Sequence, residues 1–113
     1  LFPAKAVEWI KFNPPHGNIF NSYNWGGYLD WYLPEYPVFV DGRTDLYDDQ
    51  VLNEYLEVAH GDQGWNQILD KYRVNFVLIE SESLLNKTLT ASKSWELMYQ
   101  DDLAVIYVRE SPP

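Results

Sequence analysis

Two short runs of apolar residues limit the folds open to this chain more than any other feature. Residues 37–40 and 74–79 contain one polar residue between them, Asn75, and neither run alternates between polar and apolar positions. Strands buried on both faces have this composition, and they occur in parallel sheets covered by helices on both sides. Because helical patterns separate these runs along the chain, the sequence predicts an α/β fold.

Helical and strand patterns alternate along the chain. Apolar or aromatic residues recur with helical patterning in 3–12, 25–33, 49–59, 65–72 and 83–91. Strands are expected at 18–23, 37–40 and 74–79, and Gly61 is expected to cap the helix ending at residue 59. The last two runs, 95–100 and 103–109, flank Asp101 and Asp102 and predict a β-hairpin.

These elements predict a three-layer α/β sandwich with a mostly parallel sheet of about five strands and a C-terminal antiparallel hairpin. We expect the second strand beside the first, the third on the first strand's other side, and the hairpin outermost. The 113 residues leave room for a single domain, 1–113. Since the chain lacks an initiating Met and begins almost directly in a helical pattern, we expect it to be a fragment of a larger protein.

Composition excludes several classes of function. The chain has 17 acidic and 8 basic residues, and its net charge of -9 argues against nucleic acid as a partner. No apolar run approaches the ~20 residues that a membrane-spanning helix needs, and the first residues do not resemble a signal peptide. The absence of Cys excludes disulfides, thiolate metal sites and thiol catalysis.

Polar clusters follow the first two predicted strands, where open α/β sheets carry their binding sites. A carbohydrate or lipid-linked glycan would fit a pocket in which polar groups bond hydroxyls while Trp25 or Tyr47 stacks on a sugar face. The candidate ligand-binding residues are Asn21, Asn24, Trp25, Asp41, Arg43 and Asp45. The alternative is a structural turn, in which Asp41 caps the loop and Arg43 pairs with Asp45 or Asp30.

Other chemistries have weaker support. Gly26 and Gly27 follow a predicted strand but match neither the dinucleotide nor the P-loop pattern, so they are expected to form a tight turn. The acidic residues between 41 and 49 lack the EF-hand spacing, the two His residues lack a metal motif, and no G-x-S-x-G elbow is present. We expect no metal, cofactor or catalytic residue here. Asn86 begins a glycosylation sequon, a pattern with a high chance rate.

Aromatic residues are concentrated in the first third of the chain. The segment from 23 to 36 contains Tyr23, Trp25, Tyr28, Trp31, Tyr32 and Tyr36. Half or more of these rings are expected in the core. Exposed members that cluster with Phe2 and Trp9 would form a docking face for a membrane part or a neighbouring subunit.

Four strings and the final hairpin also carry a resemblance to a known family. The strings are Ala-Val-Glu-Trp-Ile at 6–10, Asn-Ile-Phe-Asn at 18–21, Asn-Trp-Gly-Gly-Tyr-Leu at 24–29 and Val-Asp-Gly-Arg-Thr-Asp at 40–45. Together they resemble the soluble C-terminal region of prokaryotic polytopic membrane proteins similar to polyprenol-dependent, GT-C type glycosyltransferases. In such enzymes a loop between membrane helices supplies the catalytic acid, so the resemblance implies no catalytic residue in this region.

The resemblance favours a non-catalytic, extracytoplasmic accessory domain of a glycosyltransferase-like integral membrane protein. It implies a location on the extracytoplasmic face of a prokaryotic membrane, with the membrane-embedded remainder of the same polypeptide as partner and a glycan or lipid-linked sugar as a possible contact. One alternative is a free-standing carbohydrate-binding module or enzyme that uses the pocket after the first two strands. Another is a purely structural docking domain.

Overall fold

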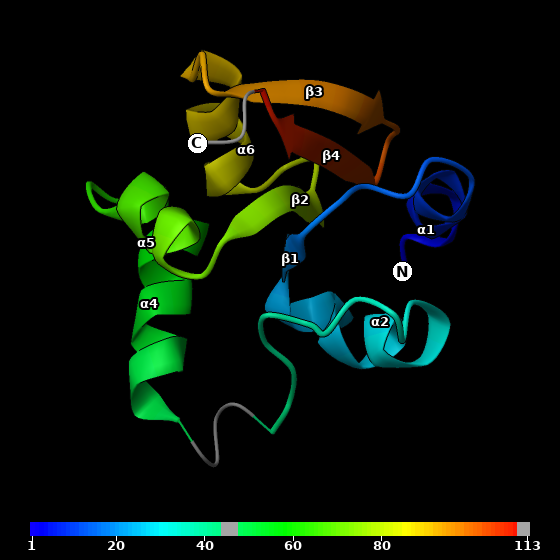
Figure 1. Ribbon diagram of the computed structural model, residues 1–113, viewed down its shortest axis with the longest axis horizontal. Coiled ribbons are helices and arrows are strands. Elements are labelled where there is room, and N and C mark those ends of the chain that lie inside the picture. Colours follow the sequence, from blue (N-terminus) through cyan, green and yellow to red (C-terminus); the bar gives the residue numbers. More distant parts are fainter. Residues whose placement is uncertain (44–47, 111–113) are drawn as a thin grey trace.

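The computed structural model describes residues 1–43 and 48–110, which form a four-stranded mixed sheet with helices on both faces (Figure 1). The strands lie in the order β1-β2-β4-β3. Their bounds are Asn18–Asn21 for β1, Val74–Glu80 for β2, Trp95–Gln100 for β3 and Ala104–Arg109 for β4. β1 and β2 run parallel, whereas β4 is antiparallel to both β2 and β3.

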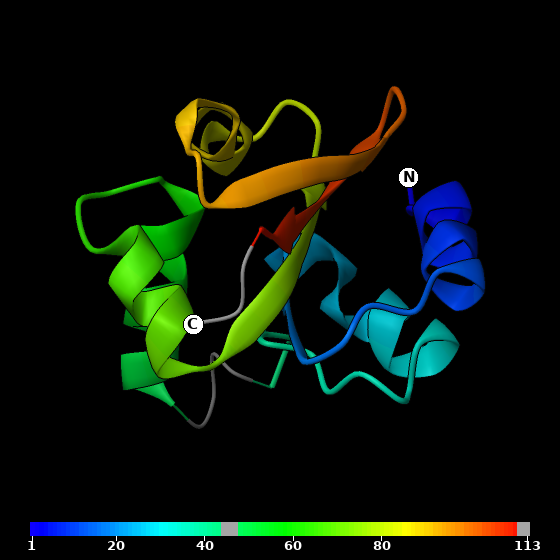
Figure 2. The same cartoon turned by 45° about the horizontal axis from the view of Figure 1, so that its top comes forward.

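Two groups of helices cover the two faces of the sheet. Helices α1 (Ala4–Phe12) and α2 (Gly26–Tyr32) pack on one face, and a 3₁₀ turn, η1 (Tyr23–Trp25), leads into α2. Helices α4 (Asp49–Ala59), α5 (Trp65–Lys71) and α6 (Leu84–Ala91) pack on the other face. Figures 1 and 2 show α1 and α2 together on one side of the sheet, opposite α4 and α5. No helix of the described segments combines the length and apolarity needed to cross a bilayer.

The central position of β2 explains its nearly continuous apolar sequence. Phe76 and Leu78 point into the core beneath α1 and α2, while Val77 and Ile79 point into the core beneath α4, α5 and α6. Because both neighbours of β2 are strands and both of its faces are covered, its apolar residues are buried. The buried strand at 74–79 and the helices on both faces are therefore confirmed.

The predicted strand at 37–40 is wrong, and with it the mostly parallel sheet of five strands. Phe39 and Val40 form an irregular segment that is held at the end of β1 by a side chain rather than by a strand ladder. One parallel pair and two antiparallel pairs make up the sheet. The expected order is confirmed where it places the third predicted strand, β2, beside the first and the hairpin at the outer edge.

Local turn and cap signals give most of the other boundaries correctly. α4 matches the predicted helix at 49–59, with the Asp48 carboxylate accepting from Val51 N at its start. Gly61 follows this helix at a φ of +68°, and a Cβ there would lie 2.2 Å from Thr88 Oγ1. In the β3–β4 hairpin, Asp101 Oδ1 accepts from the backbone N–H groups of Leu103 and Ala104. The predicted strand 18–23 ends early, since a 3₁₀ turn begins at Tyr23.

Candidate functional site

The candidate site begins at Asn21, a fully buried residue at the carboxyl end of β1. Its Nδ2 donates to Ser22 O and Val40 O, each at 2.9 Å. Its Oδ1 accepts from Phe39 N at 2.6 Å and from Val40 N at 3.4 Å. The amide therefore satisfies backbone groups of the segment at 39–40, and its donors and acceptors are engaged within the protein.

Gly26 allows the start of α2 to lie directly against the backbone at 40–41. A Cβ at this position would lie 2.2 Å from Val40 O and 2.7 Å from Asp41 Cα. Gly26 itself has ordinary right-handed helical angles. A tight turn was the expected reason for Gly26, but close packing explains it instead. At Gly27, by contrast, an added Cβ would have no atom within 4 Å.

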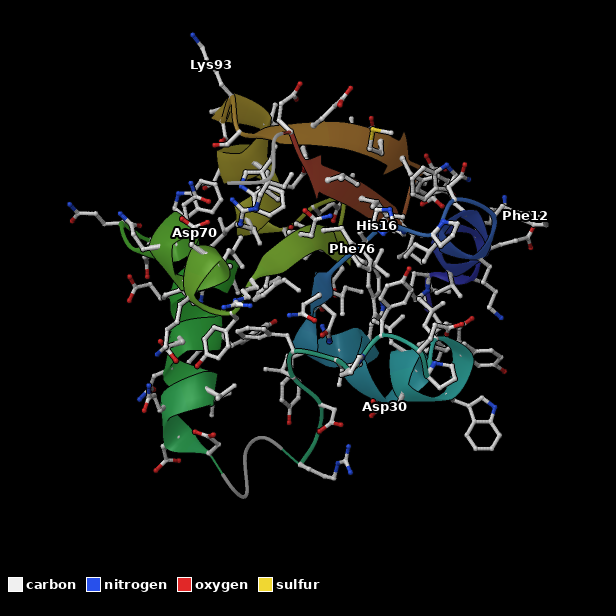
Figure 3. The ribbon with its side chains drawn as sticks, in the orientation of Figure 1. Phe12, His16, Asp30, Asp70, Phe76 and Lys93 are labelled. Atoms are coloured by element: carbon white, nitrogen blue, oxygen red, sulfur yellow. The ribbon has the colours of Figure 1, made fainter. Side chains whose placement is uncertain are left out.

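Asp41 and Arg43 form the charged centre of the site. Asp41 is 6% exposed, and its Oδ1 accepts from Arg43 N at 3.0 Å. The Arg43 guanidinium donates to Asp41 Oδ2 at 2.8 Å and lies 3.9 Å from Asp30 Oδ2 on α2. Figure 3 labels Asp30 beside α2. If the loop is a structural turn, Asp41 was expected to cap it and Arg43 to pair with Asp45 or Asp30. The Asp41 cap and the Arg43–Asp30 pair are both present.

The two carboxyl groups have pKa values displaced in opposite directions. The hydrogen bond from Arg43 is the main cause that lowers the pKa of Asp41 to about 2. Burial, followed by the hydrogen bond to Asp41 and the nearby negative charge, raises the pKa of Asp30 to about 6. Below about pH 6 the pair thus combines an ionised Asp41 with a protonated Asp30 that can both donate and accept hydrogen bonds, whereas near neutral pH Asp30 is mostly ionised and only accepts.

These side chains stand at the edge of an open pocket of about 520 Å³. The pocket is lined by Asp30, Asp41 and Arg43 and by residues 37–40. It therefore combines an apolar wall with two carboxyl groups and a guanidinium. Such a combination suits a polar ligand with several hydroxyl groups, since carboxylates accept from hydroxyls and a guanidinium donates to them.

The structure brings only some of the predicted site residues together. Asn24 Nδ2 lies 3.3 Å from Glu80 Oε2, and Asn24 lines a different pocket of about 420 Å³. Trp25 is 2% exposed and donates from Nε1 to Leu1 O, so its ring faces are occupied by the core. Asp41 and Arg43 remain together. Asp45 and Tyr47 lie outside the described residues.

Sequence reasoning missed one polar cluster, at the adjacent carboxyl ends of β1 and β2. The buried Ser22 hydroxyl donates to Glu80 Oε2 at 2.7 Å, and Tyr55 OH accepts from Tyr23 N at 2.9 Å nearby. Burial raises the pKa of Tyr55. The available signal was the position of Glu80 at the carboxyl end of an apolar strand, because neighbouring parallel strands end at the same edge.

The glycosylation sequon has a structural explanation. Asn86 of the sequon donates to Ser81 O at 2.8 Å and accepts from Tyr107 OH at 2.6 Å, so its amide is engaged. Over residues 1–43 and 48–110, no group of three or more His, Asp or Glu side chains is arranged to hold a metal ion.

Comparison with known proteins identifies a shared fold but no family. No family model matches the chain, and no curated protein sequence matches it significantly. A solved structure, the C-terminal globular domain of an oligosaccharyltransferase (AfAglB-S2) from Archaeoglobus fulgidus, has the same fold, with a TM-score of 0.71. The match covers 95% of this chain and 95% of that one at 10% sequence identity. At this identity the likeness shows the fold alone.

Replacing the two adjacent glycines with alanine is expected to change stability in opposite directions. Gly26→Ala forces a Cβ against the backbone at 40–41 and should lower the free energy of unfolding by roughly 1–3 kcal/mol. Gly27→Ala adds a methyl group in open space and should raise it by about 0.5–1 kcal/mol. Urea unfolding followed by circular dichroism measures both, and equal effects would contradict the packing role of Gly26.

The Asp30 pKa predicts an unusual pH dependence of stability. A carboxyl group whose pKa is raised in the folded state stabilises fully below its unfolded pKa, and that contribution is lost as pH rises through the folded value. With a folded pKa of about 6, the loss falls between about pH 4 and pH 6. Asp30→Asn should remove this fall, so the variant gains stability relative to wild type as pH rises.

The depressed pKa of Asp41 acts in the opposite sense, because its contribution is lost only as pH falls toward about 2. The two effects therefore occupy different pH ranges and can be separated. Carboxyl-carbon NMR titration of the folded protein reports each group directly. A titration midpoint for Asp30 near pH 4 would show that its surroundings do not raise its pKa.

Proposed function

We propose that this chain is a non-catalytic, extracytoplasmic accessory domain of a glycosyltransferase-like integral membrane protein. The observation that carries the proposal is the fold shared with the C-terminal globular domain of an oligosaccharyltransferase over 95% of both chains. The resemblance of the strings at 6–10, 18–21, 24–29 and 40–45 supports the same assignment from the sequence. The first uses backbone geometry and the second uses residue identity.

In this proposal the domain supplies binding and support rather than chemistry. The polar groups near β1 are largely hydrogen-bonded to one another, as in Ser22 with Glu80 and Arg43 with Asp41. Groups fixed in this way are suited to hold a backbone or orient a ligand. The catalytic acid is expected in a loop between membrane helices of the same polypeptide, which is also the principal partner of this domain.

The membrane topology of the parent protein provides the direct test. The open reading frame that encodes this chain should encode several membrane-spanning helices ahead of Leu1. Because these 113 residues contain no Cys, Lys93→Cys introduces one thiol into the domain at an exposed position (Figure 3), in a full-length protein freed of any other Cys. In intact cells this thiol should react with a membrane-impermeant maleimide to the same extent as after permeabilisation.

Ala104→Cys is the matched control, because Ala104 is fully buried and its thiol should react only after denaturation. Labelling of Lys93→Cys only in permeabilised cells would place the domain on the cytoplasmic side. That result, or an open reading frame without membrane helices, would overturn the proposed function.

Carbohydrate binding in the pocket of Asp30, Asp41 and Arg43 is a second candidate function. It is favoured by one observation, the placement of two carboxyl groups and a guanidinium at the edge of the open pocket of about 520 Å³. A glycan or lipid-linked sugar would place hydroxyls against these charges and an apolar ring face against the wall at 37–40. This function is compatible with the first, and it also describes a free-standing binding module.

A thermal-shift screen against monosaccharides, oligosaccharides and polyprenyl-phosphate analogues tests this candidate. A ligand present at 100 times its Kd should stabilise the domain by roughly 2.7 kcal/mol. Arg43→Ala and Asp41→Asn should abolish the ligand-induced shift. Glu35→Gln removes an exposed charge outside the pocket lining and should preserve it. Absence of any shift, together with lower basal stability of both pocket variants, would assign the loop a structural role.

A further inference from the structure

The exposed aromatic residues of the described chain lie on α1, on α2 and in the short segment that precedes α1. Phe2 is 57% exposed, Phe12 79%, Trp31 79% and Tyr32 45%, and over residues 1–43 and 48–110 no other aromatic residue is classed as exposed. We call these four residues, with Tyr28, the aromatic face. Leaving such large rings in water is unfavourable, and their concentration on α1, α2 and the residues just before α1 indicates a contact surface.

The fold holds several of these rings in fixed positions. Phe2 stacks on Tyr28 with centroids 4.9 Å apart, and Tyr28 contacts Tyr32 at 4.5 Å. Trp31 follows Tyr28 by three positions on α2 and is therefore its neighbour on the helix surface. Figure 3 shows Phe12 projecting outward from α1, and both ribbon views place α1 beside α2. The aromatic face is thus preformed on the layer opposite α4, α5 and α6.

Charge is distributed unevenly between this layer and the rest of the molecule. Within residues 1–34, Lys5 and Lys11 balance Glu8 and Asp30, so that segment has no net charge. The remainder of the chain carries the whole net charge of -9. Lys5 lines the shallow pockets beside Phe2 and beside Phe12, which places a cation among the exposed rings.

We propose that the aromatic face binds the headgroup region of a lipid bilayer, with α1 and α2 toward the membrane and the acidic body away from it. Trp and Tyr concentrate at this depth because their rings are apolar while their N–H and O–H groups remain hydrated. Lysine extends an apolar stem along such a surface and keeps its ammonium in water. The inference rests on the proposed function, which brings the domain to a membrane.

The charge distribution defines both the lipid and the orientation. A face without net charge meets a zwitterionic bilayer without net electrostatic cost, whereas the acidic body is repelled by anionic lipid. Binding should therefore be driven by ring burial, change little with salt on zwitterionic vesicles, and weaken as anionic lipid is added. Asp101 and Asp102 line the pocket next to Phe2 and mark the edge of the neutral area.

Sedimentation with phosphatidylcholine vesicles, with and without phosphatidylglycerol, tests the proposal on this chain. We expect the bound fraction to rise with lipid concentration and tryptophan emission to shift to the blue. Trp31→Ala should weaken partitioning by about tenfold, because one large ring no longer leaves water. Phe12→Ala should act in the same direction. Quenching by brominated lipid should fall when Trp31 is replaced by Phe.

Leu84→Ala is the matched control, since Leu84 is 54% exposed on α6, on the opposite side of the sheet. It should leave partitioning unchanged, and unaltered thermal unfolding of every variant would show that the fold persists. Equal losses for Leu84→Ala and Trp31→Ala, or no binding to any vesicle, would overturn the proposal.

A protein surface in place of lipid is the remaining outcome. If the chain ignores vesicles while Trp31→Ala in the full-length protein disrupts its assembly, the aromatic face contacts protein and the lipid proposal is wrong. The maleimide experiment on Lys93→Cys is independent of either result. Failure of membrane binding and failure of the proposed topology can therefore be told apart.

Discussion

The buried amide of Asn21 determines the arrangement around the carboxyl end of β1. A buried backbone group without a partner costs about 1–3 kcal/mol, and this one side chain contacts four backbone groups. It thereby fixes the segment at 39–40 beside β1 without a strand ladder. Gly26 then lets α2 begin against that segment, and the position of α2 brings Asp30 toward Arg43. The charged pocket is a consequence of this chain of contacts.

The parts of the fold that depend on local signals could be predicted from the sequence, whereas the segment held by Asn21 could not. Helix α4 and the β3–β4 hairpin depend on local signals, namely apolar spacing, the Asp48 cap, Gly61 and the short polar turn. Their prediction needed no knowledge of distant residues. The segment at 37–40 has the composition of a buried strand, and its actual partner is a side chain about twenty positions away. Of this segment only Val40 is buried, while Val38 and Phe39 are half-buried and Pro37 is exposed, so apolar composition alone did not distinguish a buried strand from a partly buried loop.

The same distinction between local contacts and contacts that depend on packing holds for the residues of the candidate site. The contact of Asp41 with Arg43 spans two positions, so a loop interpretation could anticipate it. The contribution of Asp30 depends on how α2 packs, and the sequence offered it only as one possible ion-pair partner. Asn24 and Trp25 were expected to join the same pocket. The 3₁₀ turn instead directs Trp25 into the core and places Asn24 next to Glu80, where the parallel strands end.

Burial and charge together give the molecule two different sides. β2 shares its apolar residues between two cores, so each helical layer is anchored to the sheet independently of the other. One layer can then carry exposed aromatic rings without net charge while the remaining surface stays strongly acidic. A domain built in this way has a defined orientation toward any apolar boundary, because rotating it would bury charge and expose rings.

The charged pocket lies at the margin between these sides, since Asp30 belongs to α2 and Arg43 to the loop beyond it. In the proposed arrangement, a ligand held there would lie next to the bilayer that the aromatic face contacts.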